Sequence, residues 1–267
     1  MEPVLVGSVA YTANVVPIWE GIRSYFNGAP VEMDFVLFSN YERQVEALLA
    51  GHIDLAWNTN LAYVRTVGRT NGDCRVLAMR DSDLVFQTVF VARNGSDYHG
   101  LSDLKGSRLA LGSRDSGQAR ILPQKFLADA GITSDDLQLV IFDSDVGKHG
   151  DTGRSELDAL RAVLDDEADV AALGITTWNQ LTQAGEVGVE AVWTSPEYCH
   201  CNFTALPSLA EARGEAWVSH LLKMDWDNPE HRPILEMEGL KRWVRPQLDG
   251  YQSLFEAVEE QQIPMTW

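Results

Sequence analysis

Apolar and polar residues follow one another along the chain in blocks that predict strands leading into helices. Near the start, the apolar run 4–6 meets Gly7 and Ser8, a polar loop follows, and Pro17 opens the amphipathic stretch 18–26. Short apolar runs are typical of buried strands, and apolar residues at helical spacing indicate a helix with one buried face. This first block predicts a strand, a loop and a helix.

The same block recurs in the middle of the chain. The apolar run 109–111 meets Gly112 and Ser113, the polar loop 114–118 follows, and Pro123 lies early in a helical pattern that stops at Gly131. A proline early in a helix and a glycine just after it are the expected signals for its two ends. The chain therefore contains an internal repeat.

Each copy of the repeat continues in the same way. Second apolar runs at 31–38 and 137–142 precede amphipathic stretches, which lead through Asp54 and Asp169 into short apolar strands. Parallel strands need helical crossovers and read as apolar runs. The repeat thus predicts two βαβαβ lobes with parallel central strands.

The remaining segments are expected to join and extend the lobes. Apolar runs at 86–92 and 189–194 are candidates for two crossover strands. After them come a strand-like segment at 198–205 and helical patterns that we expect to pack on the first lobe, at 209–223, 233–243 and 251–258. Two crossings imply a hinge about which the lobes close.

The charge of the chain limits its partners. It has 39 Asp and Glu against 21 Lys and Arg, a formal net charge of -18. Such a charge repels nucleic-acid phosphates and anionic lipid surfaces, so we expect neither as a partner. No apolar run approaches the ~20 residues that a membrane-spanning helix needs, so we expect no membrane insertion.

Cysteines and the first residues bear on the compartment. The three cysteines, Cys74, Cys199 and Cys201, are an odd number and predict no disulfide framework. The first residues carry neither the basic nor the apolar segment of a secretory signal. We expect a periplasmic or extracytoplasmic protein if a signal peptide was removed, and a cytoplasmic protein otherwise.

Motifs spread over nearly the whole chain resemble one known family. They are Gly7 and Ser8 after the first strand, Tyr41 before Glu46 to Leu48, the runs 54–57, 89–93, 101–106 and 113–117, Thr194 to Pro196, Glu238 to Leu240, and Gly250 with Tyr251. In kind and order they are similar to the phosphonate, phosphite and phosphate substrate-binding proteins of ABC importers. The order of the motifs is specific for the fold.

The resemblance implies an α/β fold of the two-lobed type II periplasmic-binding-protein class. Each lobe would be a mainly parallel sheet flanked by helices, and two crossover strands would join the lobes. Residues 1–88 and 195–267 would form lobe 1, and residues 89–194 would form lobe 2. The resemblance also implies a small-molecule ligand between the lobes and an ABC permease as partner, with no cofactor.

The loop 113–118 is the first candidate for ligand binding. A glycine-containing turn entering a helix exposes unpaired N–H groups and the positive end of the helix dipole, which suit a carboxylate, phosphate or sulfonate. In the family this loop is rich in hydroxyl residues and holds the oxyanion. Here Ser113, Ser116 and Gly117 fit that role, whereas Asp115 would repel a dianion. The alternative is that Asp115 or Ser116 only caps the helix.

Lobe 1 carries the equivalent loop. The repeat places Tyr11 and Asn14 opposite Ser116, and the resemblance adds Tyr41 as a side chain that closes over the ligand. A tyrosine after a strand is alternatively a half-buried packing residue. Gln87 stands where the family has an aromatic residue before the crossover strand, and we expect it in the binding set.

Trp57, Asn58 and Thr59 come at the carboxyl end of a strand, where ligands bind in open α/β sheets. We expect them to line the cleft. The alternative is a helix start, with Thr59 or Asn60 as its cap. Thr176 lies in the counterpart of this region in lobe 2 and would face them.

Two histidines complete the set. His149 lies in a glycine-punctuated loop, and family members use a histidine in such a loop to reach the ligand; an exposed surface loop is the alternative. Cys199, His200 and Cys201 are consecutive. On a strand, the cysteines would face one side and His200 the other, so we expect no metal site and place His200 in the cleft.

Two functions fit these expectations. The first is binding of a small anionic or zwitterionic solute, such as a phosphonate-like oxyanion, as the substrate-binding component of an ABC importer. The alternative is a cytoplasmic biosynthetic enzyme on the same fold, similar to enzymes of the menaquinone and thiamin-pyrimidine pathways. The chain shows no nucleophile with its base, no His-Glu-x-x-His and no P-loop, so we expect no catalytic residue and favour solute binding.

Overall fold

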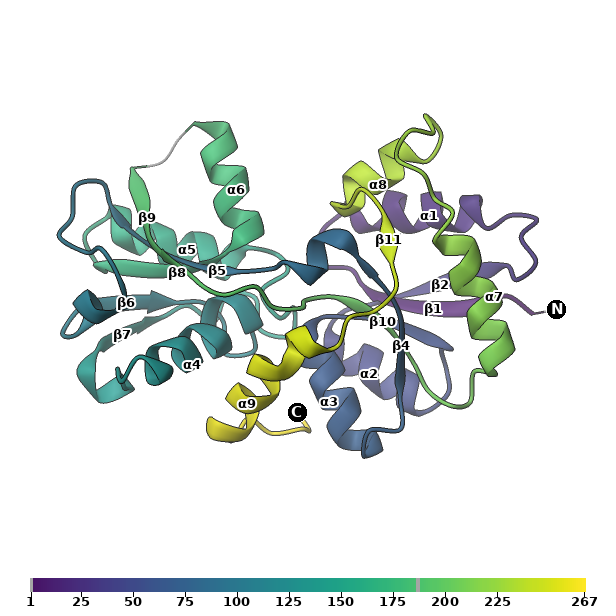
Figure 1. Cartoon of the computed structure of the whole chain (residues 1–267), viewed down its shortest axis with the longest axis horizontal. Coiled ribbons are helices and arrows are strands. Elements are labelled where there is room, and N and C mark those ends of the chain that lie inside the picture. The colour runs from purple at the N-terminus through teal and green to yellow at the C-terminus, as the bar shows by residue number, and fades with distance from the viewer. Residues whose placement is uncertain (1, 186–187) are drawn as a thin grey trace. The chain divides into compact units, whose positions relative to one another are not determined.

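The computed structural model describes residues 2–185 and 188–267, and they divide into two compact units (Figure 1). Unit 1 consists of the residues up to Val85, Cys199–Tyr251 and Pro264–Trp267. Unit 2 consists of Phe86–Tyr198 and Gln252–Ile263. The first two boundaries lie a few residues from the expected ones, but residues 252–263 belong to unit 2, although we expected them in lobe 1.

Unit 1 is built on a six-stranded mixed sheet with the order β11-β4-β10-β3-β1-β2. Its strands are β1 (Val4–Val9), β2 (Met33–Phe38), β3 (Leu55–Asn58), β4 (Arg75–Arg80), β10 (Asn202–Ala205) and β11 (Trp243–Val244). Its helices are α1 (Val15–Tyr25), α2 (Tyr41–Leu49), α3 (Asn60–Thr70), α7 (Glu211–Leu221) and α8 (Arg232–Glu238). Strand β1 pairs in parallel with β2 and β3, whereas β10 is antiparallel to β3 and β4.

Unit 2 is built on a five-stranded mixed sheet with the order β7-β6-β8-β5-β9. Its strands are β5 (Thr88–Arg93), β6 (Arg108–Leu111), β7 (Gln138–Ile141), β8 (Val170–Gly174) and β9 (Val189–Thr194). Its helices are α4 (Leu122–Asp129), α5 (Arg154–Leu164), α6 (Ile175–Ala184) and α9 (Gln252–Glu260). Strand β6 pairs in parallel with β7 and β8, and β5 is antiparallel to β8 and β9.

The internal repeat is visible in the strand order. In unit 1 the series β2-β1-β3 is parallel and is followed by the antiparallel strand β10; in unit 2 the series β7-β6-β8 is parallel and is followed by the antiparallel strand β5. Each antiparallel strand follows a passage of the chain from the other unit. Each sheet is therefore mixed, because a series of strands that pair in parallel continues through antiparallel pairs.

Two elements differ from the sequence-based expectation. The strand expected at 198–205 begins only at Asn202, and residues 199–201 have no regular structure. The helix expected at 233–243 ends at Glu238, because Gly239 adopts φ 79° and closes it in the left-handed conformation. Trp243 then lies on the short strand β11.

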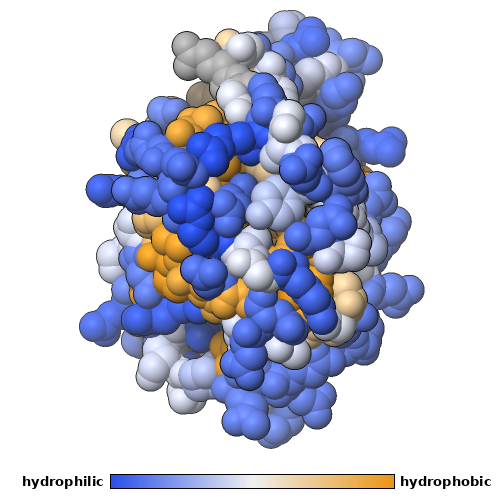
Figure 2. Space-filling model, turned by 90° about the vertical axis from the view of Figure 1, so that its left-hand side faces the viewer, coloured by the Kyte–Doolittle hydropathy of each residue, from blue (hydrophilic) through white to orange (hydrophobic). Residues whose placement is uncertain are grey.

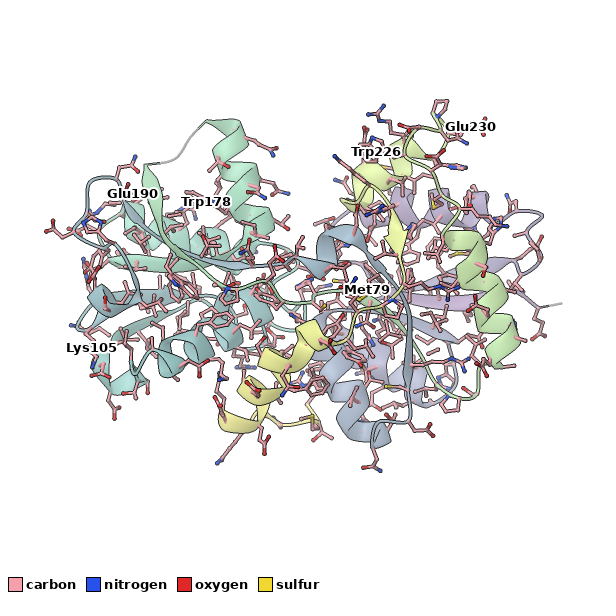
Figure 3. The ribbon with its side chains drawn as sticks, in the orientation of Figure 1. Met79, Lys105, Trp178, Glu190, Trp226 and Glu230 are labelled. Carbon is pink, nitrogen blue, oxygen red and sulfur yellow. The ribbon has the colours of Figure 1, made fainter. Side chains whose placement is uncertain are left out.

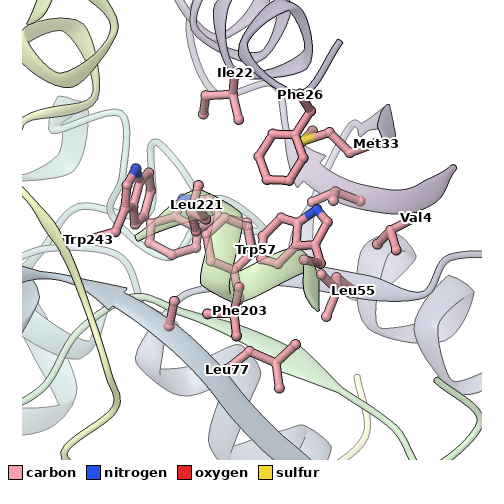
Figure 4. Packing of buried hydrophobic residues seen from close by; sticks show 14 of the residues in the cluster. Val4, Ile22, Phe26, Met33, Leu55, Trp57, Leu77, Phe203, Leu221 and Trp243 are labelled. Atoms are coloured by element: carbon pink, nitrogen blue, oxygen red, sulfur yellow. The ribbon is translucent and has the colours of Figure 1, made fainter. Parts of the chain in front are cut away.

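Apolar side chains fill a core in each unit. In unit 1 the core brings together Ile22 of α1, Trp57 of β3, Phe203 of β10 and Leu221 of α7 (Figure 4). Unit 2 has two apolar clusters. One packs α5 against the sheet and includes Val89 and Leu173, and the other includes Leu127 of α4 and Leu109 of β6. Each unit thus has the apolar interior that the two-lobe prediction requires.

The surface is predominantly polar, in line with the charge of the chain. Figure 2 shows hydrophilic side chains over most of the face it presents, with apolar side chains gathered in a few patches. Within residues 2–185 and 188–267, no helix combines the length and the apolar character that a bilayer crossing requires.

Candidate functional site

In unit 2 the parallel strands β6, β7 and β8 end at one edge of the sheet. The register pairs Leu111 with Ile141 across β6 and β7, and Leu109 with Val170 across β6 and β8. The loops 112–116 and 142–153 and the start of α6 therefore follow from neighbouring strand ends. This carboxyl edge is where open α/β sheets bind ligands.

Ser113 and Ser116 shape the loop after β6. The Ser116 N–H donates to the Ser113 carbonyl at 2.8 Å, which closes a turn just before η3 (Gly117–Ile121), a single π-helical turn. The Ser116 hydroxyl oxygen accepts from the Ala119 N–H at 3.2 Å and caps η3. The predicted capping role is therefore present. Because the cap uses only a lone pair of the oxygen, the hydroxyl hydrogen can still donate, and it has no acceptor in the described part of the chain.

The loop 142–153 places carboxylates against this turn. Asp145 accepts hydrogen bonds from the Ser113 hydroxyl and, at 2.8 Å, from the Thr152 hydroxyl. Asp115 accepts from the Gly147 N–H at 2.5 Å. Both carboxylates are buried. The Ser113 hydroxyl is thus used within the loop, and the strand ends carry negative charge of their own.

Gly150 and His149 bring the two loops into close contact. At Gly150 φ is +85°, and a Cβ there would overlap the Ser116 hydroxyl and lie 2.6 Å from the Gln118 side-chain nitrogen. His149 is fully buried with φ +53°, and its Nε2 lies 4.0 Å from the Asp115 carboxylate. The structure therefore gathers Ser113, Ser116 and His149, which the sequence placed in one site, and Gly117 begins the turn beside them.

Glu156 is a group at this edge that we did not predict. It lies on the first turn of α5, fully buried, and accepts from the Gly174 N–H at 2.8 Å and from the Gln118 side chain at 3.1 Å. Burial raises the pKa of Glu156, and its hydrogen bonds only partly oppose this effect. A carboxyl group with a raised pKa therefore lies at the strand ends.

Arg120 is the second group that we did not predict. It is half-buried on η3, and its Nη1 has no hydrogen-bond partner within residues 2–185 and 188–267. Burial lowers its pKa, with the charge of Asp143 opposing this shift. An arginine in a helical pattern usually indicates an exposed face, so no sequence signal marked this position as part of a site.

The remaining predicted residues of unit 2 have different surroundings. Gln87 donates from its side chain to the Ser195 carbonyl at 2.7 Å, so its amide is used between neighbouring segments of the sheet. Thr176 is exposed on the first turn of α6. Thr88, which we did not single out, bonds both the Gln118 carbonyl, at 2.8 Å, and the Tyr198 hydroxyl, at 3.0 Å, and so anchors the turn after Ser116.

In unit 1 the loops after β1 and β2 carry three predicted residues. Tyr11 is half-buried and packs against the apolar core, as the alternative for this residue expected. Asn14 is exposed at the N-cap position of α1 and makes no side-chain cap. Tyr41 starts α2 and is buried beside Val45 and Ala62. Ligand contacts by these three residues stay predictions.

Trp57 lies in the hydrophobic core and not on an open surface. Its ring centroid is 4.6 Å from that of Phe203 and 5.6 Å from that of Trp243, and only 4% of the residue is exposed (Figure 4). Side chains alternate along a strand, so Leu55 and Trp57 share one face of β3 and pack inward there. Trp57 is therefore a core residue of unit 1, and ligand contact by it stays a prediction.

Asn58 and Thr59 have structural partners. The Asn58 amide donates to the Thr204 hydroxyl at 3.1 Å and accepts from Gln44 at 2.9 Å, within a fully buried network. The Thr59 hydroxyl accepts from the Ala62 N–H at 3.3 Å and caps α3, the alternative considered for this position. Asn60, one residue on, is buried, and its Nδ2 has no partner among the residues described.

His200 and Cys201 lie together, which corrects the prediction that they face apart. On a strand these side chains would face apart, but β10 begins only after Cys201. His200 Nδ1 lies 3.0 Å from Cys201 Sγ and 3.7 Å from the Asp83 carboxylate. Cys199 points elsewhere and donates to the Gln247 carbonyl at 3.1 Å.

Asp83 is charged and firmly held. Arg80 binds it through two hydrogen bonds, Nε to Oδ2 at 2.6 Å and Nη2 to Oδ1 at 2.8 Å. Burial alone would raise the pKa of Asp83, but the charge and hydrogen bonds of Arg80 outweigh burial and lower the pKa to about 2. Asp83 is thus an ionised carboxylate next to His200 and Cys201.

Comparisons with known proteins agree with this architecture. A family model described as ABC transporter, phosphonate, periplasmic substrate-binding protein matches residues 11–251. The chain is 28% identical over 240 residues to the probable ABC transporter phosphite binding protein PhnD1 of Prochlorococcus marinus strain MIT 9301. That alignment covers 85% of this chain and 77% of the relative.

Solved structures show the same fold. PhnD1 from Prochlorococcus marinus in complex with methylphosphonate superposes with a TM-score of 0.75 at 23% identity, covering 97% of this chain and 98% of that one. The periplasmic aliphatic sulphonate binding protein SsuA from Escherichia coli superposes with a TM-score of 0.68 at 15% identity. The superposition covers 98% of this chain and 94% of that one.

These matches confirm the resemblance and the fold class expected from the sequence, and they do not favour the enzyme alternative. The model match spans most of the chain and includes the loops at the β6, β7 and β8 ends. The chain belongs to the phosphonate-binding family of periplasmic substrate-binding proteins of ABC transporters.

Proposed function

We propose that this chain is the solute-binding component of an ABC importer and binds a small anionic or zwitterionic solute at the β6, β7 and β8 edge of unit 2. Membership of the family supports the importer role, with an ABC permease as partner and a location outside the cytoplasm. The observation that carries the site is Ser116, which is fully buried at the strand ends: its oxygen caps η3, and its hydroxyl hydrogen has no acceptor among the described residues.

The charges at the strand ends favour one ligand class. Asp115 and Asp145 are buried beside Ser116 and Ser113, and each additional negative charge on a ligand is repelled by them. PhnD1 binds methylphosphonate and SsuA is named for aliphatic sulphonates. We therefore propose a monoanion or a zwitterion, such as a sulfonate, a singly charged phosphonate or an aminoalkylphosphonate, in preference to a dianion.

Ligand-induced thermal stabilisation tests the role of Ser116. A ligand that binds only the native state raises Tm in proportion to the logarithm of its concentration over Kd. We expect Ser116→Ala to weaken binding by about tenfold or more, since a hydrogen bond to a charged group contributes about 1.5–3 kcal/mol. Ser134→Ala, in the exposed turn before β7, is the matched control and should bind like the wild type.

The Ser116→Ala variant also loses its cap, which costs about 1 kcal/mol of stability. Circular dichroism of the free variant separates this loss from the loss of affinity. A Ser116→Ala variant that is folded and binds the same compounds as tightly as the wild type would contradict the proposed site.

A further inference from the structure

Three metal-ligating side chains meet in the interior of unit 1, and the proposed solute site uses none of them. Asp83, His200 and Cys201 each offer one ligand atom, and these atoms all lie within 4.8 Å of one another. The three residues are 0%, 3% and 3% exposed. A carboxylate, an imidazole and a thiol are thus concentrated in a small buried volume.

Backbone hydrogen bonds hold the two contributing segments together. The His200 N–H donates to the Asp83 carbonyl at 2.9 Å, and the Cys199 N–H donates to the Gly250 carbonyl at 2.8 Å. The Tyr251 hydroxyl lies 4.0 Å from the Met79 sulfur and donates to the His200 carbonyl at 3.1 Å. Figure 3 labels Met79 among the side chains of unit 1. The positions of the three side chains are therefore set by the fold itself, which reduces the ordering cost of binding an ion.

The Asp83 carboxylate can serve Arg80 and a cation together. Its two oxygens offer about four lone-pair positions, and Arg80 takes one on each oxygen. The oxygen Oδ1 also faces His200 Nδ1, at 3.7 Å. Carboxylates that bind metals are commonly hydrogen-bonded on their other side, and Arg80 supplies such a bond.

The charges of the buried groups favour an added cation. Arg80 carries one positive charge and contacts two carboxylates, Asp83 at 2.6 Å and Glu238 at 3.5 Å. Arg80, Asp83 and Glu238 together have a net charge of -1. A divalent cation bound to a Cys201 thiolate brings the net charge to zero, and buried charges are stable when they are balanced.

We propose that Asp83 Oδ1, His200 Nδ1 and Cys201 Sγ bind a divalent transition-metal ion of the borderline class, such as zinc or ferrous iron. Mixed sulfur, nitrogen and oxygen ligands select this class over magnesium and calcium. The Nδ1 to Sγ distance is 3.0 Å. Bonds of about 2.0 and 2.3 Å in a tetrahedral site place these atoms about 3.5 Å apart, so the side chains move by about half an ångström. A fourth position is left for water or another small ligand.

Cobalt(II) titration of the metal-free full chain tests this site without any solute. A cobalt ion bound to a thiolate gives a near-ultraviolet charge-transfer band that oxygen and nitrogen ligands do not give. We expect this band to saturate at one equivalent of cobalt. Cys201→Ser should abolish it, whereas Cys199→Ser should retain it, because the Cys199 thiol bonds the Gln247 carbonyl and lies outside the cluster.

Two further measurements keep the result decisive. His200→Gln, checked for folding by circular dichroism, should weaken cobalt binding at least about tenfold, and it replaces Cys201→Ser if that variant does not fold. Zinc bound after dialysis, measured by elemental analysis, should be close to one equivalent per chain. Absence of both the charge-transfer band and bound zinc would overturn the proposal, as would a band that persists in Cys201→Ser and is lost in Cys199→Ser.

Discussion

At the residue scale, the proposed site is a helix cap that we expect to serve both the fold and a ligand. The Ser116 oxygen stabilises η3, while neighbouring carboxylates use the other donors of the loop, including the Ser113 hydroxyl. A solute must therefore be recognised by the donors that the loop does not use itself.

Gly150 is the residue at which this arrangement is most sensitive to added volume. We expect Gly150→Ala to weaken solute binding at least tenfold, because a Cβ there overlaps the Ser116 hydroxyl and separates the two loops. Gly131→Ala is the matched control. The φ of Gly131 is +75°, but among the described residues no atom outside its chain neighbours lies within 4 Å of an added Cβ.

The two alanine variants share the cost of a left-handed residue, about 1–2 kcal/mol. Urea unfolding measures this common cost, and binding assays measure the difference between them. Equal affinities of folded Gly150→Ala and Gly131→Ala for the same solute would show that the contact of the loops does not matter for binding.

Glu156 gives the site a defined pH dependence of stability. Its folded-state pKa is raised by burial, so its contribution to stability is complete below its unfolded pKa and is lost as the pH rises through the folded pKa. We expect Glu156→Gln to be more stable than the wild type near pH ~8, with a difference that shrinks toward pH ~5. Urea unfolding across this range measures it.

The exposed Glu259→Gln variant is the control, and its stability difference should not change over the same range. If the stability difference between Glu156→Gln and the wild type also stays constant across this pH range, the expected pKa shift of Glu156 is contradicted.

The sequence could place the candidate loops but not the direction of every side chain. The repeat and the motifs were enough to gather Ser116 and His149, because strand ends in a parallel sheet meet at one edge. The pattern did not show that Trp57 packs in the core, since a tryptophan at a strand end is compatible with either face. Glu156 and Arg120 were missed because charged residues in a helical pattern ordinarily indicate solvent exposure.

At the element scale, helix α9 is held in unit 2 by Lys125 of α4. The Lys125 ammonium lies 2.6 Å from Asp129 on its own helix and 3.4 and 3.7 Å from Glu260 and Glu256 of α9. The Gln261 side chain also donates to the Ile121 carbonyl at 2.8 Å. An amphipathic pattern alone could not show which unit α9 packs against. It predicts an apolar face but not the surface that this face contacts.

Lys125→Met should release part of this attachment. The carboxylates are half-exposed, so we expect a loss of only about 0.5–1 kcal/mol, but faster amide hydrogen exchange in residues 252–260. Lys105→Met, which removes an exposed lysine 3.7 Å from Asp136, is the control. Unchanged exchange in 252–260 in the Lys125→Met variant would contradict this attachment.

The segment 198–205 shows how an element boundary changes a chemical conclusion. Its alternation suggested a strand with the cysteines opposite His200, but the first residues are bound instead to Asp83 and Gly250. Those bonds come from distant parts of the chain, which local pattern does not report. The strand begins at Asn202, and the metal-ligating atoms consequently meet.

At the scale of the whole molecule, the repeat was the decisive signal. It predicted two α/β units with parallel central strands, and both are present, each with an antiparallel strand added after the chain returns from the other unit. The repeat is visible in the order of apolar blocks because each copy must bury its own sheet under helices. The antiparallel strands are single apolar runs whose direction depends on the path of the chain.

The central claim, that this chain binds a small singly charged or zwitterionic solute, is tested most directly by calorimetric titration of the purified full chain. The panel is methylphosphonate, 2-aminoethylphosphonate, phosphite, phosphate, methanesulfonate and taurine. We predict saturable one-to-one binding of at least one sulfonate, phosphonate or aminoalkylphosphonate, tighter than the binding of phosphate. No heat of binding for any compound, with protein that unfolds cooperatively, would contradict it.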